Sequence, residues 1–256
     1  MRVAVLNDIH GNLPAVEAVL DEVRVAGVDR IVVGGDVFPG PMAHLVLRTL
    51  VTCGIPADFI YGNGEIAVLD ELAGRTPRVP DAHRSSVRWN AQQLDPAERE
   101  FISRWPMTLR LNVAPLGAVC VCHATPRNEN DIFTRHTAEE SLTPIFDPIG
   151  TPLVVCGHTH LVMDRAIGRT RVVNPGSVGM PFGPAGADWM VLGPGLEFRH
   201  TNYDLQRAAE RVRASGYPGA EEFAAKSILQ PPSEEDMLKV YAQHQVLTGG
   251  ADVRRE

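Results

Sequence analysis

Residues 3–12 read VAVLNDIHGN and combine an apolar stretch with a polar turn. The apolar part, residues 3–6, is short and rich in valine, which is typical of a strand buried in a sheet. Pro14 opens a segment whose apolar residues recur at helical spacing, so we expect a helix after the turn. Asp8 and His10 therefore lie where a strand leads into a helix, an edge at which α/β sheets build sites. Alone, the pattern also fits a helix-capping aspartate beside a surface histidine.

The same arrangement recurs four times later in the chain. The later apolar runs occupy residues 31–33, 59–61, 119–122 and 153–156. The polar residues that follow them include Asp36, Asn63, His123, His158 and His160. These side chains bind hard or borderline metals. At three of the strand ends a glycine stands directly before the polar residue, which lets the backbone approach closely. Each histidine alone could be an ordinary core or surface residue, but recurrence at five strand ends predicts a metal site.

The composition is ordinary for a globular protein. The 256 residues suffice for one large or two small domains, with 44% hydrophobic and 21% charged residues. The net charge of −7 argues against non-specific binding to nucleic acid or an anionic membrane. We find no apolar run that could span a bilayer and no signal peptide, so we expect a cytoplasmic protein. Without a Cys-x-x-Cys motif, the four cysteines are expected to be buried free thiols.

The order of the patterns predicts an α/β fold. Residues 1–62 alternate between strand and helix, which favours a parallel sheet. Residues 65–105 form a helical insertion, with Asp81 and Asp95 as expected N-caps. Three hairpins follow, at residues 107–122, 161–173 and 189–200. Two sheets packed face to face, with helices outside, accommodate both parts. We expect one domain over residues 1–202 and a helical C-terminal extension, residues 203–248, packed on it.

The motifs resemble those of the calcineurin-like metallophosphoesterases. They are Asp8-x-His10, Gly35-Asp36, Gly62-Asn63, His123 and Gly157-His158-x-His160, in that order and each after an expected strand. The stretch at residues 174–179, NPGSVG, further resembles the bacterial and archaeal stand-alone phosphoesterases, a phosphodiesterase-containing branch. The resemblance covers nearly the whole chain. It implies a four-layer α-β-β-α sandwich of two mixed sheets, with a two-metal site at one edge.

The resemblance also implies residue roles. One metal would be held by Asp8, His10, Asp36 and His160. The other would be held by Asp36, Asn63, His123 and His158, so that Asp36 bridges the two. The implied reaction is hydrolysis of a phosphodiester or phosphomonoester by a hydroxide bound to both metals, with Asp36, Asn63 and His123 in the catalytic set.

The ligand chemistry narrows the cofactor. Nitrogen and oxygen ligands without thiolate suit Mn²⁺, which we favour, and also Fe, Zn²⁺, Ni²⁺ or Mg²⁺, whereas the histidines argue against Ca²⁺. We expect a small phosphoester or nucleotide-like substrate, no stable nucleic-acid complex and no membrane partner. The tail helices could cap the core or mediate a homo-oligomer.

Position 64 departs from the family pattern. Many members have a histidine directly after the asparagine, thought to protonate the leaving group, but here Gly64 stands there and Glu65 follows. General acid catalysis is typically worth ~10²–10⁴-fold, so hydrolysis would favour good leaving groups or use another acid. His44 is the first candidate for that acid, against the alternative of a solvated helix histidine.

Three further residues are candidates for the site. Arg127 could bind a substrate phosphate as a bidentate donor, or pair at the surface with Glu129 or Asp131. Asn12 either orients the first turn or approaches the substrate. Phe182 could flank the mouth of the site.

A different class of function is also open. The same fold serves as a protein-binding scaffold in a retromer subunit, where catalysis has largely been lost. All seven metal-binding residues are present here, which favours an enzyme, although Gly64 leaves room for a weak one. A nuclease is disfavoured because the chain is acidic and has no basic stripe.

Overall fold

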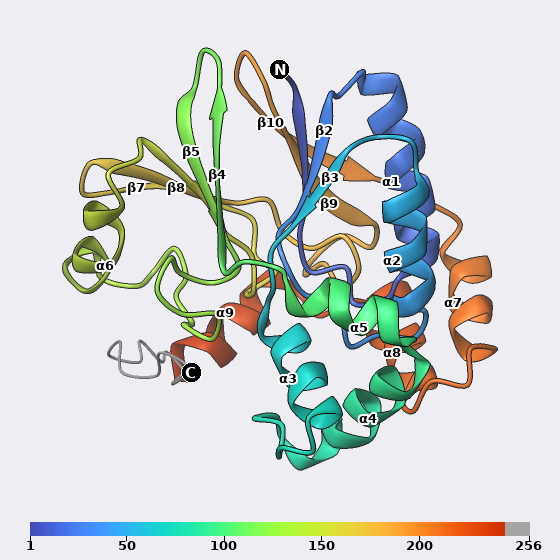
Figure 1. Ribbon diagram of the computed structural model, residues 1–256. Helices are drawn as coiled ribbons and strands as arrows, with labels where there is room; N and C mark the ends of the chain where they lie inside the picture. Colours follow the sequence, from blue (N-terminus) through green and yellow to red (C-terminus); the bar gives the residue numbers. More distant parts are fainter. Residues whose placement is uncertain (244–256) are drawn as a thin grey trace.

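The computed structural model describes residues 1–243 and contains two five-stranded sheets (Figure 1). The first sheet has the order β10-β9-β1-β2-β3, in which β1, β2 and β3 are parallel, β9 is antiparallel to β1, and β10 is antiparallel to β9. Its strands are β1 (Val3–Leu6), β2 (Arg30–Val33), β3 (Ala57–Phe59), β9 (Ala187–Leu192) and β10 (Leu196–Thr201). The sheet is therefore mixed, as expected.

The second sheet has the order β4-β5-β6-β8-β7 and is also mixed. Strands β5, β6 and β8 are parallel, whereas β4 and β7 are antiparallel edge strands. The strands are β4 (Thr108–Val113), β5 (Gly117–Cys122), β6 (Leu153–Val155), β7 (Met163–Ile167) and β8 (Thr170–Asn174). The three predicted hairpins are β4–β5, β7–β8 and β9–β10.

Strand β1 shows why its sequence is continuously apolar. Val3 and Val5 pack into the core between the two sheets, whereas Ala4 and Leu6 pack on the helices behind the first sheet. Successive side chains of a strand point to opposite faces, so a strand covered on both faces has no polar position. The layer order helix–sheet–sheet–helix follows directly from this double burial.

Helices cover the outer faces of both sheets. Helices α1 (Leu13–Ala26) and α2 (Ala43–Thr52) lie on the first sheet, and α6 (Glu139–Phe146) lies on the second (Figure 1). Cys120 and Cys122 share the face of β5 that packs under α6, together with the buried Cys156 of the β6 end. All are free thiols, as the sequence predicts.

The insertion is helical as predicted, with one correction. It contains α3 (Asn63–Leu72), α4 (Arg84–Gln93) and α5 (Pro96–Ser103). Asp95 caps α5 in a reciprocal capping box with Glu98, each backbone N–H donating over 2.9 Å to the other side chain. The N-cap prediction for Asp81 is wrong: Asp81–His83 forms a 3₁₀ turn, so α4 begins at Arg84, two residues later than expected.

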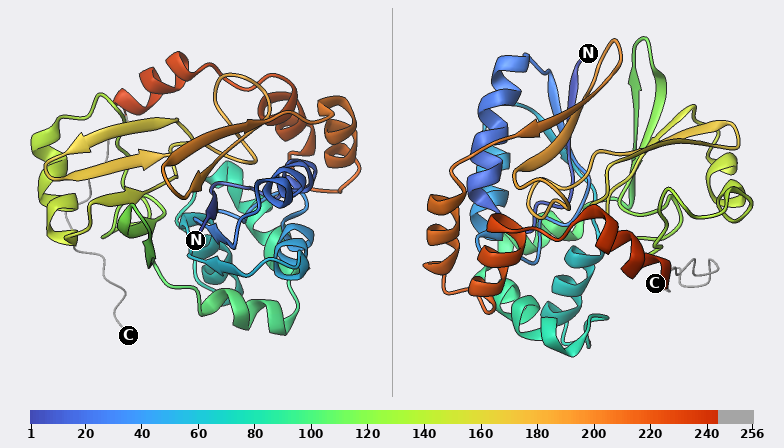
Figure 2. Two further views of the ribbon diagram at one scale, coloured as in Figure 1. Left: turned by 90° about the horizontal axis from the view of Figure 1, so that it is seen from above. Right: turned by 180° about the vertical axis from the view of Figure 1, so that it is seen from behind.

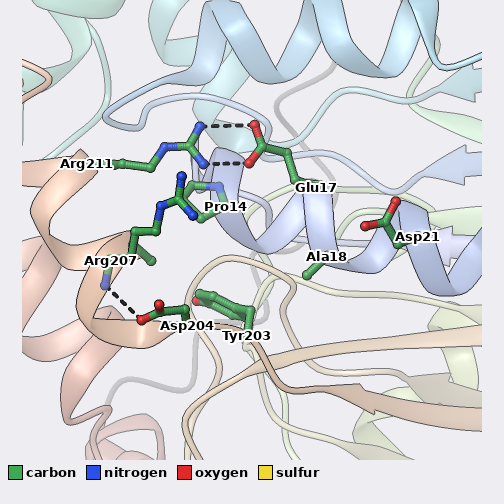
Figure 3. Close-up of a pocket in the computed structure, with 9 residues that line it drawn as sticks. Pro14, Glu17, Ala18, Asp21, Tyr203, Asp204, Arg207 and Arg211 are labelled. Carbon is green, nitrogen blue, oxygen red and sulfur yellow. Dashed lines mark hydrogen bonds and ion pairs between the residues drawn. The ribbon is translucent and has the colours of Figure 1, made fainter.

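The C-terminal extension crosses the end of the sheets at which β1 ends (Figures 1 and 2). It comprises α7 (Leu205–Arg213), α8 (Ala220–Phe223), a π-helical turn (Ala224–Leu229) and α9 (Glu234–Gln243). Arg211 of α7 pairs with both carboxylate oxygens of Glu17 on α1, over 2.5 and 3.0 Å, across a pocket of about 260 Å³ (Figure 3). The predicted end of the extension, residues 244–248, lies outside the described residues.

None of the helices within residues 1–243 is both long and apolar enough to cross a lipid bilayer.

Helix α1 offers a matched test of the core. Val23 is fully buried and Val25 is 90% exposed on the same helix. Val23→Ala is expected to lower the free energy of unfolding by about 2 kcal/mol, because it deletes two buried methyl groups and leaves a cavity. Val25→Ala makes the same change in helix propensity without loss of burial. Urea denaturation of both variants measures the difference, and equal stabilities would contradict the packing described.

Candidate metal centre

Seven polar side chains from both sheets meet at one edge of the sandwich. They follow the ends of five strands: Asp8 and His10 after β1, Asp36 after β2, Asn63 after β3, His123 after β5, and His158 and His160 after β6. The strand ends share this edge because β1, β2 and β3 are parallel to one another, as are β5 and β6. The structure thus brings together all the residues predicted to bind metal.

These side chains form two adjoining groups. In the first, Asp8, His10 and His160 place one ligand atom each within 4.8 Å of one another, and in the second Asp36, His123 and His158 do the same. Asp36 Oδ2 lies 3.5 Å from Nε2 of His10 and 3.5 Å from Nε2 of His123, so it faces both groups. Asn63 Oδ1 lies 3.0 Å from Nε2 of His123, beside the second group. The division matches the one implied by the family resemblance.

Three of the histidine rings are oriented by backbone carbonyls. A carbonyl oxygen near Nδ1 favours the tautomer with hydrogen on Nδ1, which leaves the Nε2 lone pair free for a cation. The carbonyls are Pro39 at 3.3 Å from His10, Gly34 at 3.0 Å from His123 and Met180 at 2.8 Å from His160. Nε2 of His10 and Nε2 of His160 then face each other over 3.2 Å. Converging lone pairs and two buried carboxylates fit divalent cations.

The backbone at the site is unusual. Among residues 1–243, the non-glycine residues with positive φ are Asp8, His10, Asp36, His158 and His160, with φ between 45° and 69°. All five are predicted metal-binding residues. Left-handed backbone at non-glycine residues is costly and concentrates at functional sites, so this distribution supports a functional role for the edge.

The electrostatics of the centre are dominated by attraction between carboxylates and imidazoles. Burial opposes ionisation of Asp8 and Asp36, but nearby histidines outweigh it and lower the pKa of both. Burial likewise disfavours the charged form of His123, yet Asp36 raises the pKa of His123 to about 10. The pKa of His160 is also raised, against burial, by Asp8. Burial and the neighbouring His123 lower the pKa of His158 to about 4.

Glu65 supports the metal centre, a role that was not predicted from the sequence. Its fully buried carboxylate accepts backbone N–H groups from Asp36 at 2.9 Å, Phe38 at 3.0 Å and Gly62 at 2.7 Å. It therefore ties the loop after β2 to the start of α3 and positions Asp36. Burial and repulsion from Asp36 raise the pKa of Glu65 to about 7, although the three backbone donors favour the ionised form. A glutamate three residues after a helix N-cap, here Gly62, was the available signal.

Gly64 cannot carry a side chain in this structure. A Cβ atom there would lie 1.9 Å from the carbonyl oxygen of Phe38 and 3.0 Å from Oδ1 of Asp36. The Gly64 N–H donates to that same Asp36 oxygen over 2.8 Å. The departure from the family pattern is therefore built into the backbone, and any acid for the leaving group must come from elsewhere.

The structure places His44 away from the metal centre. It lies on α2, where the charged neighbours of its ring are Arg48 and Glu98, and it does not line the cavity beside the site. The prediction that His44 supplies the missing acid therefore gains no support. Arg127 donates to the buried Asp131 over 3.1 Å, which is the ion-pair alternative for that residue.

Asn12 is a buried structural residue at the start of α1. Its Oδ1 accepts from the N–H of Ala15 over 3.2 Å, and its Nδ2 donates to Gly179 O and to the Tyr203 hydroxyl over 3.0 and 3.1 Å. These bonds correspond to the first of its two predicted roles, orientation of the turn. A direct role in substrate binding is left as a prediction.

A cavity of about 590 Å³ opens directly from the metal centre. His10, Asp36 and Asn63 are among the residues that line it. Phe182 also lines it and stacks on His160, with ring centroids 5.3 Å apart and planes at 23°, so Phe182 does flank the site. The rest of the wall comes from the insertion and the extension, including His83 and Tyr217, which no local motif singles out.

Comparison with known proteins identifies the family. The sequence pattern of the calcineurin-like phosphoesterase superfamily domain matches residues 1–193, and the chain therefore belongs to this superfamily. A hypothetical protein from Pyrococcus horikoshii OT3 has a similar fold, with a TM-score of 0.75 and 18% identity over 91% of this chain and 99% of its own. A metallophosphoesterase from Sphaerobacter thermophilus has a TM-score of 0.65 and 23% identity over 88% of this chain and 97% of its own. No curated protein matches the chain.

The contact at Gly64 yields a first prediction for the site. Gly64→Ala is expected to destabilise the protein by about 1–3 kcal/mol, because the new Cβ forces the Phe38 carbonyl and Asp36 to move. Gly195→Ala is the matched control, since a Cβ at Gly195 meets no atom within 4 Å. Thermal unfolding with and without Mn²⁺ measures both. A fully stable Gly64→Ala variant with normal metal binding would contradict the described loop.

The raised pKa of His123 predicts that metal binding releases protons. A cation needs the neutral imidazole, but in the metal-free protein His123 keeps its proton up to a pKa of about 10. Metal affinity is therefore expected to rise with pH up to that value, by about tenfold per pH unit for each proton displaced.

Calorimetry of Mn²⁺ binding in buffers of different ionisation enthalpy measures this release. His136→Gln, which removes an exposed histidine, is the control and should release as many protons as the wild type. His123→Gln should release fewer. Binding heats that do not depend on the buffer would refute the prediction.

Proposed function

We propose that the protein is a metal-dependent phosphoesterase that hydrolyses a small phosphodiester or phosphomonoester. The observation that carries this proposal is the pair of buried histidine–carboxylate groups at one sheet edge, which adjoin through Asp36. Membership of the calcineurin-like superfamily supports the same conclusion.

Two divalent cations are the proposed cofactors. Asp8, His10 and His160 would hold one, and Asp36, Asn63, His123 and His158 the other. Asp36 would contribute to both because its carboxylate faces both groups. Such a pair of cations, when bound, lowers the pKa of bound water and neutralises charge on the phosphoryl oxygens. Mn²⁺ is our first choice, with Fe, Zn²⁺, Ni²⁺ and Mg²⁺ as alternatives compatible with the same ligands.

The residues around the metal centre determine which esters we expect the protein to hydrolyse. Carbonyl contacts fix the imidazoles of His10, His123 and His160, and Glu65 fixes the loop that carries Asp36. Gly64 offers no proton to the leaving group. We therefore expect faster hydrolysis of esters whose leaving groups depart as stable anions, such as aryl phosphates, aryl diesters and anhydrides.

We propose that the extension belongs to the same functional unit as residues 1–202. Tyr217, Phe223 and Met237 line the cavity that His10 and Asp36 also line. Its removal would open one wall of the site. A cytoplasmic location and a homo-oligomeric state are predictions from the sequence alone.

Asp36→Asn is the direct test of the proposed function. With p-nitrophenyl phosphate or bis-p-nitrophenyl phosphate and added Mn²⁺, this variant is expected to lose more than about 100-fold in kcat/KM, because the carboxylate facing both groups is gone. Asp21→Asn is the control, since Asp21 is a surface residue paired with Arg24. Rates for metal-stripped protein, with each divalent ion restored singly, complete the measurement.

Two outcomes would oppose the proposal. Equal turnover by the wild type and Asp36→Asn would place the chemistry elsewhere. Absence of turnover with every metal, despite two bound ions per chain, would favour the protein-binding scaffold instead.

A further inference from the structure

We infer that the cavity beside the metal centre binds the organic part of the substrate, and that this part is an aromatic, predominantly apolar group of at least two rings. The inference rests on the proposed function and deepens it by naming a substrate class. The substrate is accordingly an aryl phosphate ester, bound with its phosphoryl group at the metal centre.

Continuity and size are the first argument. Three residues of the candidate metal centre, His10, Asp36 and Asn63, line the cavity. Its volume of about 590 Å³ is that of roughly twenty water molecules at about 30 Å³ each. A phosphoryl group fills only a small part of this space. The volume falls within the ~300–1,000 Å³ typical of pockets for small organic ligands.

The second argument is the character of the wall. Met180, Phe182 and Tyr217 are partly exposed and give the wall an apolar and aromatic surface, and Phe223 of the core, which is 8% exposed, adjoins them. The Tyr217 ring is held edge-on between two other rings: Trp89 at 5.5 Å and Phe223 at 6.4 Å between centroids. Rings held in this way favour flat apolar ligands by stacked or edge-to-face contact.

Charged groups of the wall lie at its rim. Arg78, His83, Glu222 and Lys226 line the cavity at exposed positions, and Lys226 pairs with Glu222 over 2.8 Å. Lys226 and Glu222 offset each other's charge, and Arg78 and His83 are exposed to solvent, so these groups do not form a concentrated cationic site for a second phosphate. An aromatic group therefore fits the wall better than a polyphosphate chain.

The backbone at Gly64 gives independent support. A phenolate leaves without protonation far more readily than an alkoxide, so an aryl ester tolerates the missing acid. The apolar wall is formed by residues within 79–87 and 180–223. The position without a side chain, Gly64, belongs to a different segment of the chain. Both favour the same class of substrate.

The test compares phenyl phosphate with 4-biphenylyl phosphate, whose leaving phenols have similar acidity. The Mn²⁺-loaded wild type is expected to prefer the biphenylyl ester by roughly tenfold to hundredfold in kcat/KM, chiefly through KM, because the second ring is buried. Ala82 lines the cavity at an exposed position, and Ala82→Trp should fill it and reduce the preference to about onefold. Ala73→Trp, at an exposed position outside the cavity, should keep the wild-type preference. Ser85→Trp replaces Ala82→Trp if the latter does not fold.

A second measurement separates this inference from the proposed function. Calorimetry gives the affinities of the same proteins for phenylphosphonate and 4-biphenylylphosphonate, which are not hydrolysed. If no ester is hydrolysed but the biphenylyl phosphonate binds tighter and Ala82→Trp removes that difference, the phosphoesterase proposal fails while the cavity still selects aryl groups. If esters are hydrolysed without any preference, or if the preference survives Ala82→Trp, the inference is overturned and the phosphoesterase proposal stands.

Discussion

Two carboxylates and four imidazoles are packed together where two sheets meet, and neighbouring pairs lie only 3.2 to 3.5 Å apart. The loops that carry them hold a left-handed backbone, which costs about 1 kcal/mol or more at each non-glycine residue. Backbone hydrogen bonds between loops hold this arrangement, including His10 N to Asp36 O over 2.8 Å and Gly157 N to His123 O over 2.7 Å. The other layers of the fold depend on these loops, since each one joins a central strand to the next element.

Close approach between the loops explains why glycine precedes several of the ligands. A Cβ at Gly62 would lie 2.2 Å from Oδ1 of Asp36, and one at Gly157 would lie 2.5 Å from Oδ2 of Asp8. The loops from different strands therefore touch through bare backbone. A bulkier residue at either place would push apart the carboxylates that the site needs close together.

Much of this could be predicted from the chain alone because strand ends are local features. A short apolar run followed by Asp, Asn or His identifies both a strand and a residue at its end, and parallel pairing then brings the ends together. Contacts between residues far apart in the sequence could not be predicted in this way. The bonds of Asn12 to Gly179 and Tyr203 join residues far apart in the chain, and the capping-box position of Glu65 does not indicate that it also binds the N–H groups of Asp36 and Phe38.

His44 and Asp81 show a second limit of sequence reasoning. Proximity along the chain to Asp36 suggested a role for His44, but the charged groups near its ring are Arg48 and Glu98. A good capping residue at Asp81 was followed by a 3₁₀ turn rather than by the helix itself. The wall of the cavity is even more difficult to predict from the sequence, because it consists of residues from the insertion, the loop at 180–182 and the extension.

The metal centre and one wall of the cavity come from different parts of the sequence. The family pattern matches residues 1–193, which include every residue of the candidate metal centre, whereas Tyr217, Phe223 and Met237 come later in the chain. The residues of the candidate metal centre and one wall of the cavity are therefore encoded in consecutive parts of the gene. Replacement of the terminal segment by recombination would change this wall while the residues of the metal centre stayed the same.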